Sequence, residues 1–389
     1  MIRSIVFVIT ATMPGPPALA HHGAGTFDLS RTVTFTDARL TSVELINPHS
    51  WLYFDVAEAD GSVGHHRCEM RSAHVLRRSG WSADLFQIGA QVTIDASPDE
   101  ADPKSCYLQT LLYPDGTRMD RYGQYVRGAE GALREVRGPL AEPNRDRPAR
   151  LPNGKPNLAG DWAPEQRVMA DPRGVGGGLV PLGQLETIDA GGNPAGGRGT
   201  GGGGRGAGPR LYGGTALTGL GERAAADFSN VDNPRFRCET TSILFDWTFD
   251  GPVNRITQNE ETIVIQYGQH NLERTIHMNM IRHPLNLQPS RAGHSIGRWE
   301  GDVLVVDTIR FLPGVLSAPV RHSDRLHVVE RFSLDPETKL LTRTYAAEDS
   351  LYLQGRYTGS DVVQPADAPY AEDECSEQGF IDYSEPPGR

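Results

Sequence analysis

Three histidines have the residue type and the placement that bind a metal ion. His21 and His22 directly follow Ala18-Leu19-Ala20, a small-x-small pattern typical of signal-peptidase cleavage. Cleavage there makes His21 the first residue, so that its free amine and its imidazole can chelate one ion, and His49 supplies a further imidazole. Such a nitrogen set suits copper(II), and we predict a copper site at His21, His22 and His49. The alternative is a polar terminus and an ordinary turn histidine.

A second group of residues is suited to acid–base chemistry. His322 and Asp324 lie close together, and Glu330 follows in a predicted strand. A histidine or carboxylate that points into a barrel can act as a general base. His322, Asp324 and Glu330 are therefore the candidate catalytic residues of an enzyme hypothesis, for which the reaction is isomerisation, hydration or hydrolysis. The alternative is that they form surface ion pairs.

Large aromatic side chains in the second half of the chain can line an apolar pocket. The candidate ligand-binding residues are Trp162, Trp247, Trp299 and Tyr267. Pockets for small molecules are lined mainly by apolar and aromatic side chains, so this set predicts a small apolar or amphipathic ligand. The alternative is that the same side chains fill a core.

One short motif matches that of a serine hydrolase. Gly293-His294-Ser295-Ile296-Gly297 fits the pattern Gly-x-Ser-x-Gly, and Asp307 and His322 follow it in the chain order of such enzymes. That nucleophile needs a strand before it and a helix after it. The surrounding sequence predicts strands and turns, which favours a barrel turn for Ser295.

Short strands separated by turn signals must position these residues, so the predicted fold class is all-β and mainly antiparallel. The first domain has five or six strand signals and one helical segment at 72–81, as in a small closed barrel of the oligonucleotide-binding (OB) type in topology. The second has eight or so strands, as in an up-and-down barrel that can hold one small ligand. The expected divisions are a signal peptide at 1–20, the small barrel at 21–126, a proline-rich linker at 127–156, the larger barrel at 157–373 with a disordered glycine-rich insertion at 174–214, and a tail at 374–389.

Composition limits the classes of partner. The net charge is −11 and no basic stripe is visible, which disfavours nucleic acid as a partner. After the signal segment, no apolar run approaches the length of about 20 residues that a membrane span needs. The four cysteines allow three pairings, of which the domain division favours Cys68–Cys106 and Cys238–Cys375. Disulfides and a signal peptide predict a periplasmic or secreted protein.

Two resemblances add to this interpretation. Residues 21–120 resemble DUF6152, a family of uncharacterised exported bacterial proteins, through His21-His22, Asn47-Pro48-His49-Ser50-Trp51 and Arg78-Ser79-Gly80-Trp81. The second domain resembles a lipocalin-like (calycin-type) segment of exported soil-bacterial proteins, which implies a barrel but no defined reaction. The residues that carry this second resemblance are Gly293–Asp302, Val305–Thr308, His322–Asp324 and Val328–Phe332.

The leading hypothesis is therefore an exported protein that binds a small molecule in a lipocalin-like cavity and carries a copper site near its N-terminus. An enzyme that uses the barrel interior for acid–base chemistry is the second hypothesis. An envelope scaffold protein is the third. The sequence leaves the ligand, the reaction and the oligomeric state open.

Overall fold

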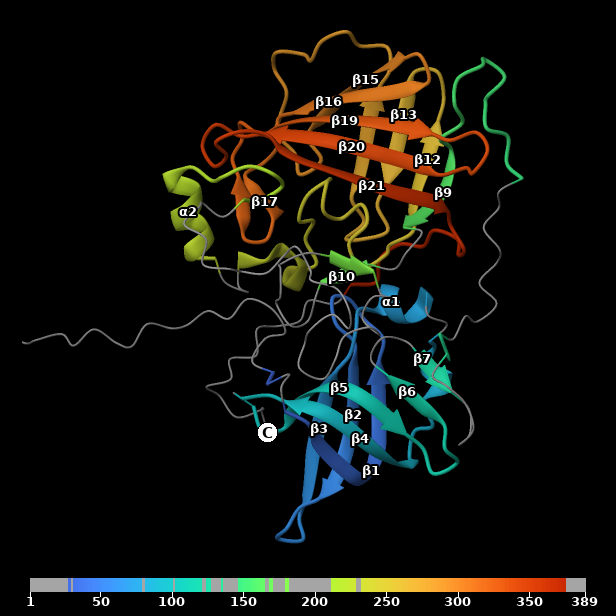
Figure 1. Ribbon diagram of the computed structural model, residues 1–389, viewed down its shortest axis with the longest axis vertical. Coiled ribbons are helices and arrows are strands. Elements are labelled where there is room, and N and C mark those ends of the chain that lie inside the picture. Colours follow the sequence, from blue (N-terminus) through green and yellow to red (C-terminus); the bar gives the residue numbers. More distant parts are fainter. Residues whose placement is uncertain are drawn as a thin grey trace, which may run out of the picture.

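Two β-barrels stacked along the long axis make up the computed structural model (Figure 1), which confirms the all-β class. The structure describes residues 27–28, 31–78, 81–100, 102–120, 146–164, 211–228 and 232–375, and short strands at 124–126, 134–135, 168–170 and 179–181. The predicted signal segment, His21 and His22, residues 376–389 and most of the stretch 174–214 lie outside the described residues.

The first barrel has the strand order expected of an OB fold. Its ring runs β1-β2-β3-β5-β4 and closes through the β1–β4 pair, with β3 and β5 parallel and the helix α1 between β3 and β4. The bounds are β1 Val33–Glu44, β2 Trp51–Ala57, β3 Val63–Glu69, α1 Ala73–Arg78, the 3-10 turn η1 Ala83–Leu85, β4 Gln91–Pro98 and β5 Ser105–Leu112. Three short strands continue the sheet beyond β5, namely β6 Arg118–Asp120, β7 Gln124–Val126 and β8 Arg134–Glu135.

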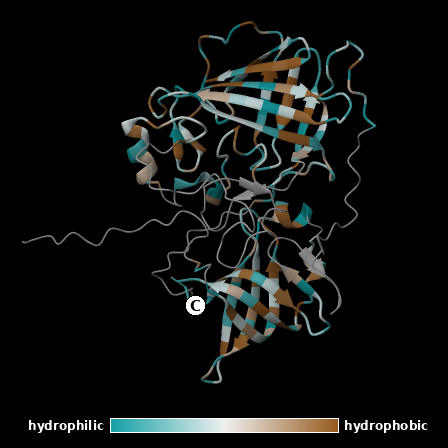
Figure 2. Ribbon diagram, viewed as in Figure 1, coloured by the Kyte–Doolittle hydropathy of each residue, from teal (hydrophilic) through white to brown (hydrophobic). Residues whose placement is uncertain are grey.

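A disulfide fixes the closure of this barrel. Cys68 on β3 and Cys106 on β5 are directly opposed in the parallel pair and are bonded, with their Cα atoms 4.4 Å apart. Both sulfurs are buried in the core of the small barrel. Along the strands of both barrels hydrophobic and hydrophilic residues alternate (Figure 2), because successive side chains of a strand point to opposite faces.

The second barrel is a closed ring of nine strands in the order β12-β13-β14-β15-β16-β19-β20-β21-β9. The bounds are β9 Gly160–Pro164, β12 Asn254–Gln258, β13 Thr262–Gln266, β14 Glu273–His277, β15 His294–Glu300, β16 Val303–Ile309, β19 His327–Leu334, β20 Leu341–Glu348 and β21 Tyr357–Pro365. Outside the ring lie β10 Val168–Ala170, β11 Leu179–Pro181, α2 Gly219–Ala226, the 3-10 helix η4 Pro234–Arg237, β17 Gly314–Ser317 and β18 Val320–His322.

The ring departs from a pure up-and-down barrel at one place. β14 and β15 pair in parallel, whereas each other neighbouring pair of the ring is antiparallel. An odd number of strands cannot alternate in direction all the way round a closed ring, so one pair must be parallel. The long connection at residues 278–293 makes this possible, because it carries the chain back along the barrel before β15 begins.

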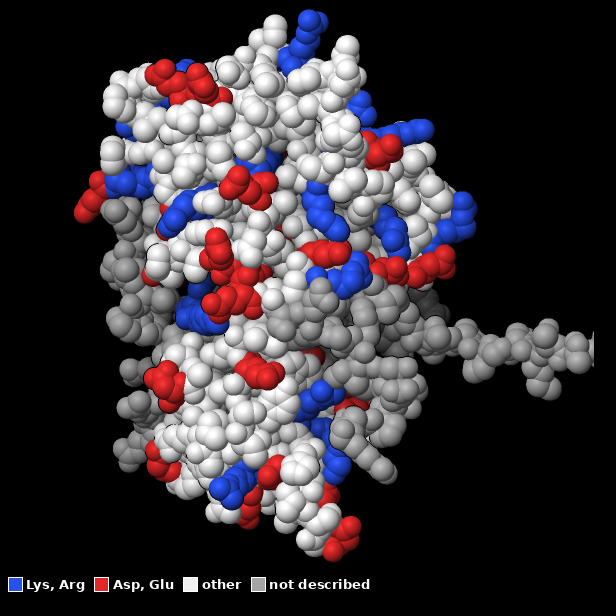
Figure 3. Space-filling model, turned by 180° about the vertical axis from the view of Figure 1, so that it is seen from behind, with Lys and Arg blue, Asp and Glu red and all other residues white. Residues whose placement is uncertain are grey.

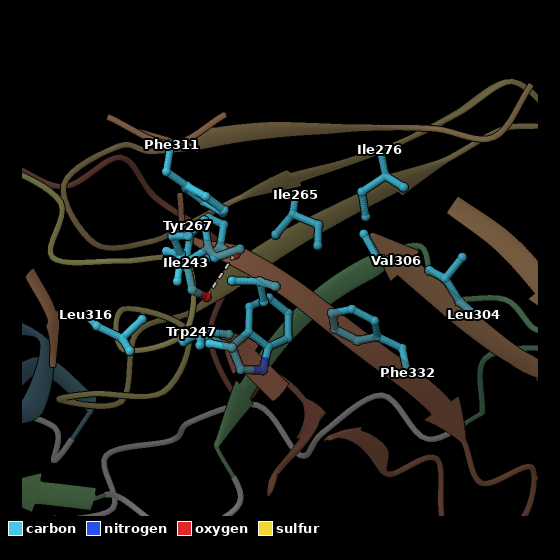
Figure 4. Close-up of a cluster of buried hydrophobic side chains, with 14 of the residues drawn as sticks. Ile243, Trp247, Ile265, Tyr267, Ile276, Leu304, Val306, Phe311, Leu316 and Phe332 are labelled. Atoms are coloured by element: carbon cyan, nitrogen blue, oxygen red, sulfur yellow. Dashed lines mark hydrogen bonds between the residues drawn. The ribbon is translucent and has the colours of Figure 1, made fainter. Parts of the chain in front are cut away.

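A segment of turns, residues 241–250, enters the second barrel, and we call it the plug. Ile243, Leu244 and Trp247 of the plug belong to the same buried hydrophobic cluster as the barrel-lining side chains of β12–β16 and β19. Figure 4 shows Trp247 among the barrel residues Ile265, Tyr267 and Phe332. The chain thus places its own side chains inside the barrel.

The two barrels meet where Arg78 of α1 contacts Gly251, directly after the plug, and Asp367 in the segment that follows β21, residues 366–375. The disulfide Cys238–Cys375 ties that segment to the end of η4, so both disulfide pairings expected from the sequence are present. Within the described residues, no helix has the length and apolar character needed to cross a membrane. On the face shown in Figure 3, acidic and basic side chains are interspersed, with no continuous basic stripe.

Candidate functional site

The three residues predicted to act in acid–base catalysis lie in different environments. His322 is buried at the end of β18, where its Nδ1 lies 3.1 Å from the carbonyl oxygen of Ser323. Asp324 is exposed on the following turn. Glu330 is fully buried inside the second barrel, between two arginines. The structure therefore does not bring them together as one site.

The predicted aromatic lining is mostly core. Trp162, Trp247 and Tyr267 are fully buried in the second barrel's hydrophobic cluster, and Trp299 packs against its edge, partly exposed. The Tyr267 hydroxyl donates to the carbonyl oxygen of Ile243 in the plug at 3.2 Å (Figure 4). Trp247 of the plug meets the rings of Tyr267 and Phe332 edge to face, and all four aromatic residues belong to or pack against one buried cluster, as a packed interior requires.

The motif around Ser295 lies in a strand rather than in a turn. Ser295 points into the barrel, where its hydroxyl accepts a hydrogen bond from Arg274 and contacts Thr308. Asp307 lies on the opposite face of β16, where His283 and His327 contact its carboxylate at 2.9 and 3.0 Å. A strand and a hairpin surround Ser295, so the structure lacks the strand–turn–helix that a hydrolase nucleophile needs.

Of the predicted copper ligands, the structure describes His49 alone. Its Nδ1 lies 3.2 Å from a carboxylate oxygen of Glu69, and its ring meets the edge of Phe236 from the second domain at 5.6 Å. His49 is partly exposed and lies where the two barrels meet. The copper site therefore stays a prediction.

A charged network occupies the interior of the second barrel. Arg274 hydrogen-bonds to Ser295, Thr308 and Glu330, and Arg343 binds Glu330 and Asp361. Arg343 also donates to the carbonyl oxygens of Ile243 and Leu244 at 2.9 and 2.8 Å, which holds the plug in place. Two arginines balance two carboxylates, and each group has several partners, which is what a buried polar network needs to be stable.

A second buried polar group lies at the junction of the barrels and is partnered differently. We call it the junction cluster, and its members are His74 of α1, Arg235 of η4, Asp246 of the plug, Gln269 and His270 of the β13–β14 loop, and Asp373 of the final segment.

Asp373 is the anchor of the junction cluster. Its carboxylate accepts hydrogen bonds from the side-chain amide of Asn47 at 2.7 Å and from the backbone N–H of His270 at 2.8 Å, and His74 Nε2 lies 3.5 Å away. Burial by itself raises the pKa of Asp373, but His74 and the two hydrogen bonds outweigh it and lower the pKa to about 2. Asp373 is therefore ionised although its side chain is fully buried.

His270 is the most unusual member of the cluster. Its side chain is fully buried, its Nδ1 lies 3.7 Å from Asp373 Oδ2, and neither ring nitrogen has a hydrogen-bond partner among the described residues. Burial, together with the nearby Arg235, lowers the pKa of His270 to about 4, so its ring is neutral at neutral pH. Its backbone is left-handed, with φ of 56°, which few residues other than glycine adopt.

Arg235 and Asp246 extend the cluster toward the plug. Arg235 is paired with Asp250 at 2.6 Å and stacks on the ring of Phe249 at 3.8 Å. Burial raises the pKa of Asp246 to about 7. Buried polar atoms of the cluster that lack a hydrogen-bond partner among the described residues are His74 Nε2, Arg235 Nε, Asp246 Oδ1, Gln269 Oε1 and both ring nitrogens of His270.

The junction itself is held by Arg78 at the end of α1. The Arg78 guanidinium binds both carboxylate oxygens of Asp367 at 3.2 and 3.3 Å and donates to the carbonyl oxygen of Gly251 at 2.9 Å. Gly251 has a positive φ, and a Cβ there would lie 2.9 Å from Arg78 Nη1. A side chain at Gly251 would therefore push against the arginine that docks the two barrels.

Comparison with known proteins found a matching family for part of the chain. Residues 10–105 match the model of a family of unknown function (DUF6152). The N-terminal domain is therefore similar to that family, as the sequence motifs predicted. No curated protein and no solved structure matches the chain. Asn47 and Arg78, which belong to two of the three motifs of the resemblance, are the residues that bind Asp373 and Asp367 of the second domain.

No pattern in the sequence pointed to His74, His270 or Asp373 as site residues. They come from a helix, a hairpin loop and the final segment, and Asn47 and Asp373 are separated by 326 positions. No spacing motif joins residues that meet only when two domains dock. The motif Asn47-Pro48-His49 lies at the junction, but it does not indicate which residues of the second domain contact it.

Proposed function

We propose that the protein is an exported binding protein whose ligand binds in the junction cluster. The observation that supports this is the set of buried polar atoms without hydrogen-bond partners around His270. More than nine in ten buried polar groups in native proteins are paired, so an unpaired group needs an explanation, such as a ligand or an ordered water. Several unpaired groups in one place favour a site that is completed by another molecule.

The junction suits this role better than the barrel interior that the sequence suggested. Trp247 and Leu244 of the plug pack inside that barrel, and Arg343 binds the plug's carbonyl groups. A ligand there would have to displace the plug and break charged hydrogen bonds. At the junction it would instead supply partners to groups that have none.

The polar groups of the cluster define what the ligand must offer. The neutral ring of His270 presents one donor and one acceptor, Gln269 Oε1 is an acceptor, and Asp373 is an anion. These groups call for a small polar or cationic ligand rather than the apolar one expected from the aromatic residues.

The enzyme hypothesis has one supporting observation, at Asp246. A carboxyl group with a pKa of about 7 can both give and take a proton near neutral pH, which is the property of a general acid or base. Asp246 would take this role in place of His322, Asp324 and Glu330. With a substrate in hand, the pH–rate profile tests the enzyme hypothesis. It is supported if the wild-type rate changes with pH near 7 and this change is absent in Asp246→Asn.

The binding proposal is tested by whether a ligand stays bound to the protein through purification. Native mass spectrometry of the wild-type protein should show an added mass that disappears on denaturation. His270→Leu should lose it, because the replaced ring contributes two of the unpaired nitrogens. His66→Leu, which removes a buried histidine of the first barrel, should keep it. An added mass that persists in His270→Leu, or a wild-type protein that retains nothing, would contradict the proposal.

A further inference from the structure

We propose that the connection between β14 and β15, residues 278–293, docks the protein on an anionic lipid surface, and we call it the docking loop. Figure 1 shows this loop above β15, at the end of the molecule away from the first barrel. The contact is peripheral, because apolar side chains at the tip of the loop enter the headgroup region and the chain does not cross the bilayer. The inference does not depend on the junction site, since no residue of the junction cluster belongs to the loop.

Two large apolar side chains of the docking loop are almost completely exposed. Ile281 is 97% exposed and Leu285 is 89% exposed, whereas the next large hydrophobic side chain among the described residues, Leu211, reaches 61%. A single exposed apolar residue needs no explanation, but two within five positions of one loop form a common apolar surface. Because both side chains protrude, they suit a partner that can close around them, as the headgroup region of a bilayer does.

The backbone of the docking loop is held firmly although its apolar side chains face outward. His283, between the two apolar residues, points back to the barrel, where its Nε2 lies 2.9 Å from Asp307 Oδ1 on β16 and its Nδ1 lies 2.8 Å from His294 Nδ1 on β15. Arg310 donates to the carbonyl oxygen of Leu285 at 3.4 Å. A loop that is already fixed loses less conformational entropy when it docks, so these contacts favour a binding role for the exposed pair.

The charge of the docking loop fits an anionic surface. The whole chain has a net charge of −11, but residues 278–294 contain two arginines, two histidines and no acidic residue. Arg291 pairs with Glu239. Arg282 on the loop and Arg310 beside it are exposed and form no ion pair among the described residues. Basic residues next to a membrane surface are attracted to anionic lipids, so these two arginines would strengthen the apolar contact.

The residue types at the tip favour lipid over a protein partner. Binding energy between proteins is concentrated in tryptophan, tyrosine and arginine side chains, and leucine is under-represented among the residues that carry it. The docking loop contains no tryptophan, tyrosine or phenylalanine. Leucine and isoleucine, in contrast, are among the residues that enter a bilayer most favourably. An aliphatic pair flanked by arginines therefore indicates an anionic membrane surface.

The test is flotation of the full-length protein with vesicles of equal parts phosphatidylglycerol and phosphatidylcholine, and with vesicles of phosphatidylcholine alone. The wild type should float with the anionic vesicles, bind the neutral ones more weakly, and lose affinity for the anionic ones as salt is added. The double variant Ile281→Ser, Leu285→Ser should lower the partition coefficient roughly 100-fold, about tenfold for each apolar side chain. Arg282→Gln should lower it roughly fivefold.

The matched control is Ile88→Ser in the first barrel. Ile88 is also an exposed apolar residue, with 54% of its surface accessible, but it lies outside the docking loop. Ile88→Ser should float as the wild type does, and circular dichroism should show that each variant is folded.

Two outcomes would overturn the docking proposal. The first is a wild-type protein that does not float with the anionic vesicles. If that protein is instead a dimer that the double variant dissociates, the exposed pair is a contact between two copies of the chain. The second is equal flotation of the wild type and the double variant, which would assign membrane binding to another segment, such as the predicted signal peptide.

Discussion

The barrel interior and the junction both bury ionisable side chains, but the two places differ in how these side chains are hydrogen-bonded. Inside the second barrel Arg274, Glu330 and Arg343 bind one another and their neighbours. At the junction His270 is as deeply buried, but its ring nitrogens have no hydrogen-bond partners among the described residues. Burial alone therefore does not distinguish a site from a core. The pairing of the buried polar atoms does.

The largest effect should follow from breaking the interior network. Arg343→Met would leave Glu330 and Asp361 with less counter-charge and release two carbonyl groups of the plug, so we expect the free energy of unfolding to fall by about 3–5 kcal/mol. Urea denaturation followed by tryptophan fluorescence measures it. Arg331→Met is the matched control, because that arginine is exposed and forms a surface pair with Glu300, and its loss should cost less than about 1 kcal/mol. Equal effects would refute the structural role of the network.

A smaller effect is expected at the contact between the barrels. Arg78→Met removes the hydrogen bonds to Asp367 and Gly251, so we expect a loss of about 2–3 kcal/mol and separate unfolding transitions for the two domains. Scanning calorimetry distinguishes one transition from two. The neighbouring Arg77, which is exposed and lies 3.6 Å from Glu374, is the control. If Arg77→Met separates the domains as readily as Arg78→Met, Arg78 does not hold the junction.

The last effect depends on pH and concerns Asp246. Because burial raises its pKa from 3.8 in the unfolded chain to about 7 in the fold, the folded state binds the proton more tightly. The stabilisation is thus full below about pH 4 and is lost as the pH rises through 7. Asp246→Asn should remove this dependence and be more stable than the wild type at pH 8, with little difference at pH 4. Parallel stability–pH curves for the two proteins would contradict the expectation.

The sequence predicted the architecture well because barrels leave local signals. The alternation of apolar residues in segments such as Trp51–Val56 indicated strands, and the division into domains selected the two disulfide pairs that form. The parallel pair β14–β15 had no such signal, because it results from closing an odd number of strands into a ring. The plug was also missed, since nothing in residues 241–250 shows locally that they enter a barrel.

The sites were harder to predict than the fold. Glu330 was a candidate for catalysis because a carboxylate that points into a barrel can act as a general base, but its partners Arg274 and Arg343 lie on other strands. His270 looks like an ordinary loop residue in the sequence. It becomes significant only when Asp373 and α1 are brought beside it by the docking of the two domains. Whether a buried polar side chain finds a hydrogen-bond partner depends on the three-dimensional structure, and local sequence patterns do not predict it.

The central claim, that the junction cluster is a ligand site rather than a structural network, is tested most directly by the unfolding free energy of His270→Leu against that of His322→Leu. Both changes replace a buried histidine with an apolar side chain, but the ring of His322 contacts the carbonyl oxygen of Ser323 whereas the ring nitrogens of His270 lack partners. We predict that ligand-free His270→Leu stays within about 1 kcal/mol of the wild type or exceeds it, and that His322→Leu loses about 2 kcal/mol. A loss in His270→Leu as large as that in His322→Leu would show that the ring is there for stability and would contradict the account.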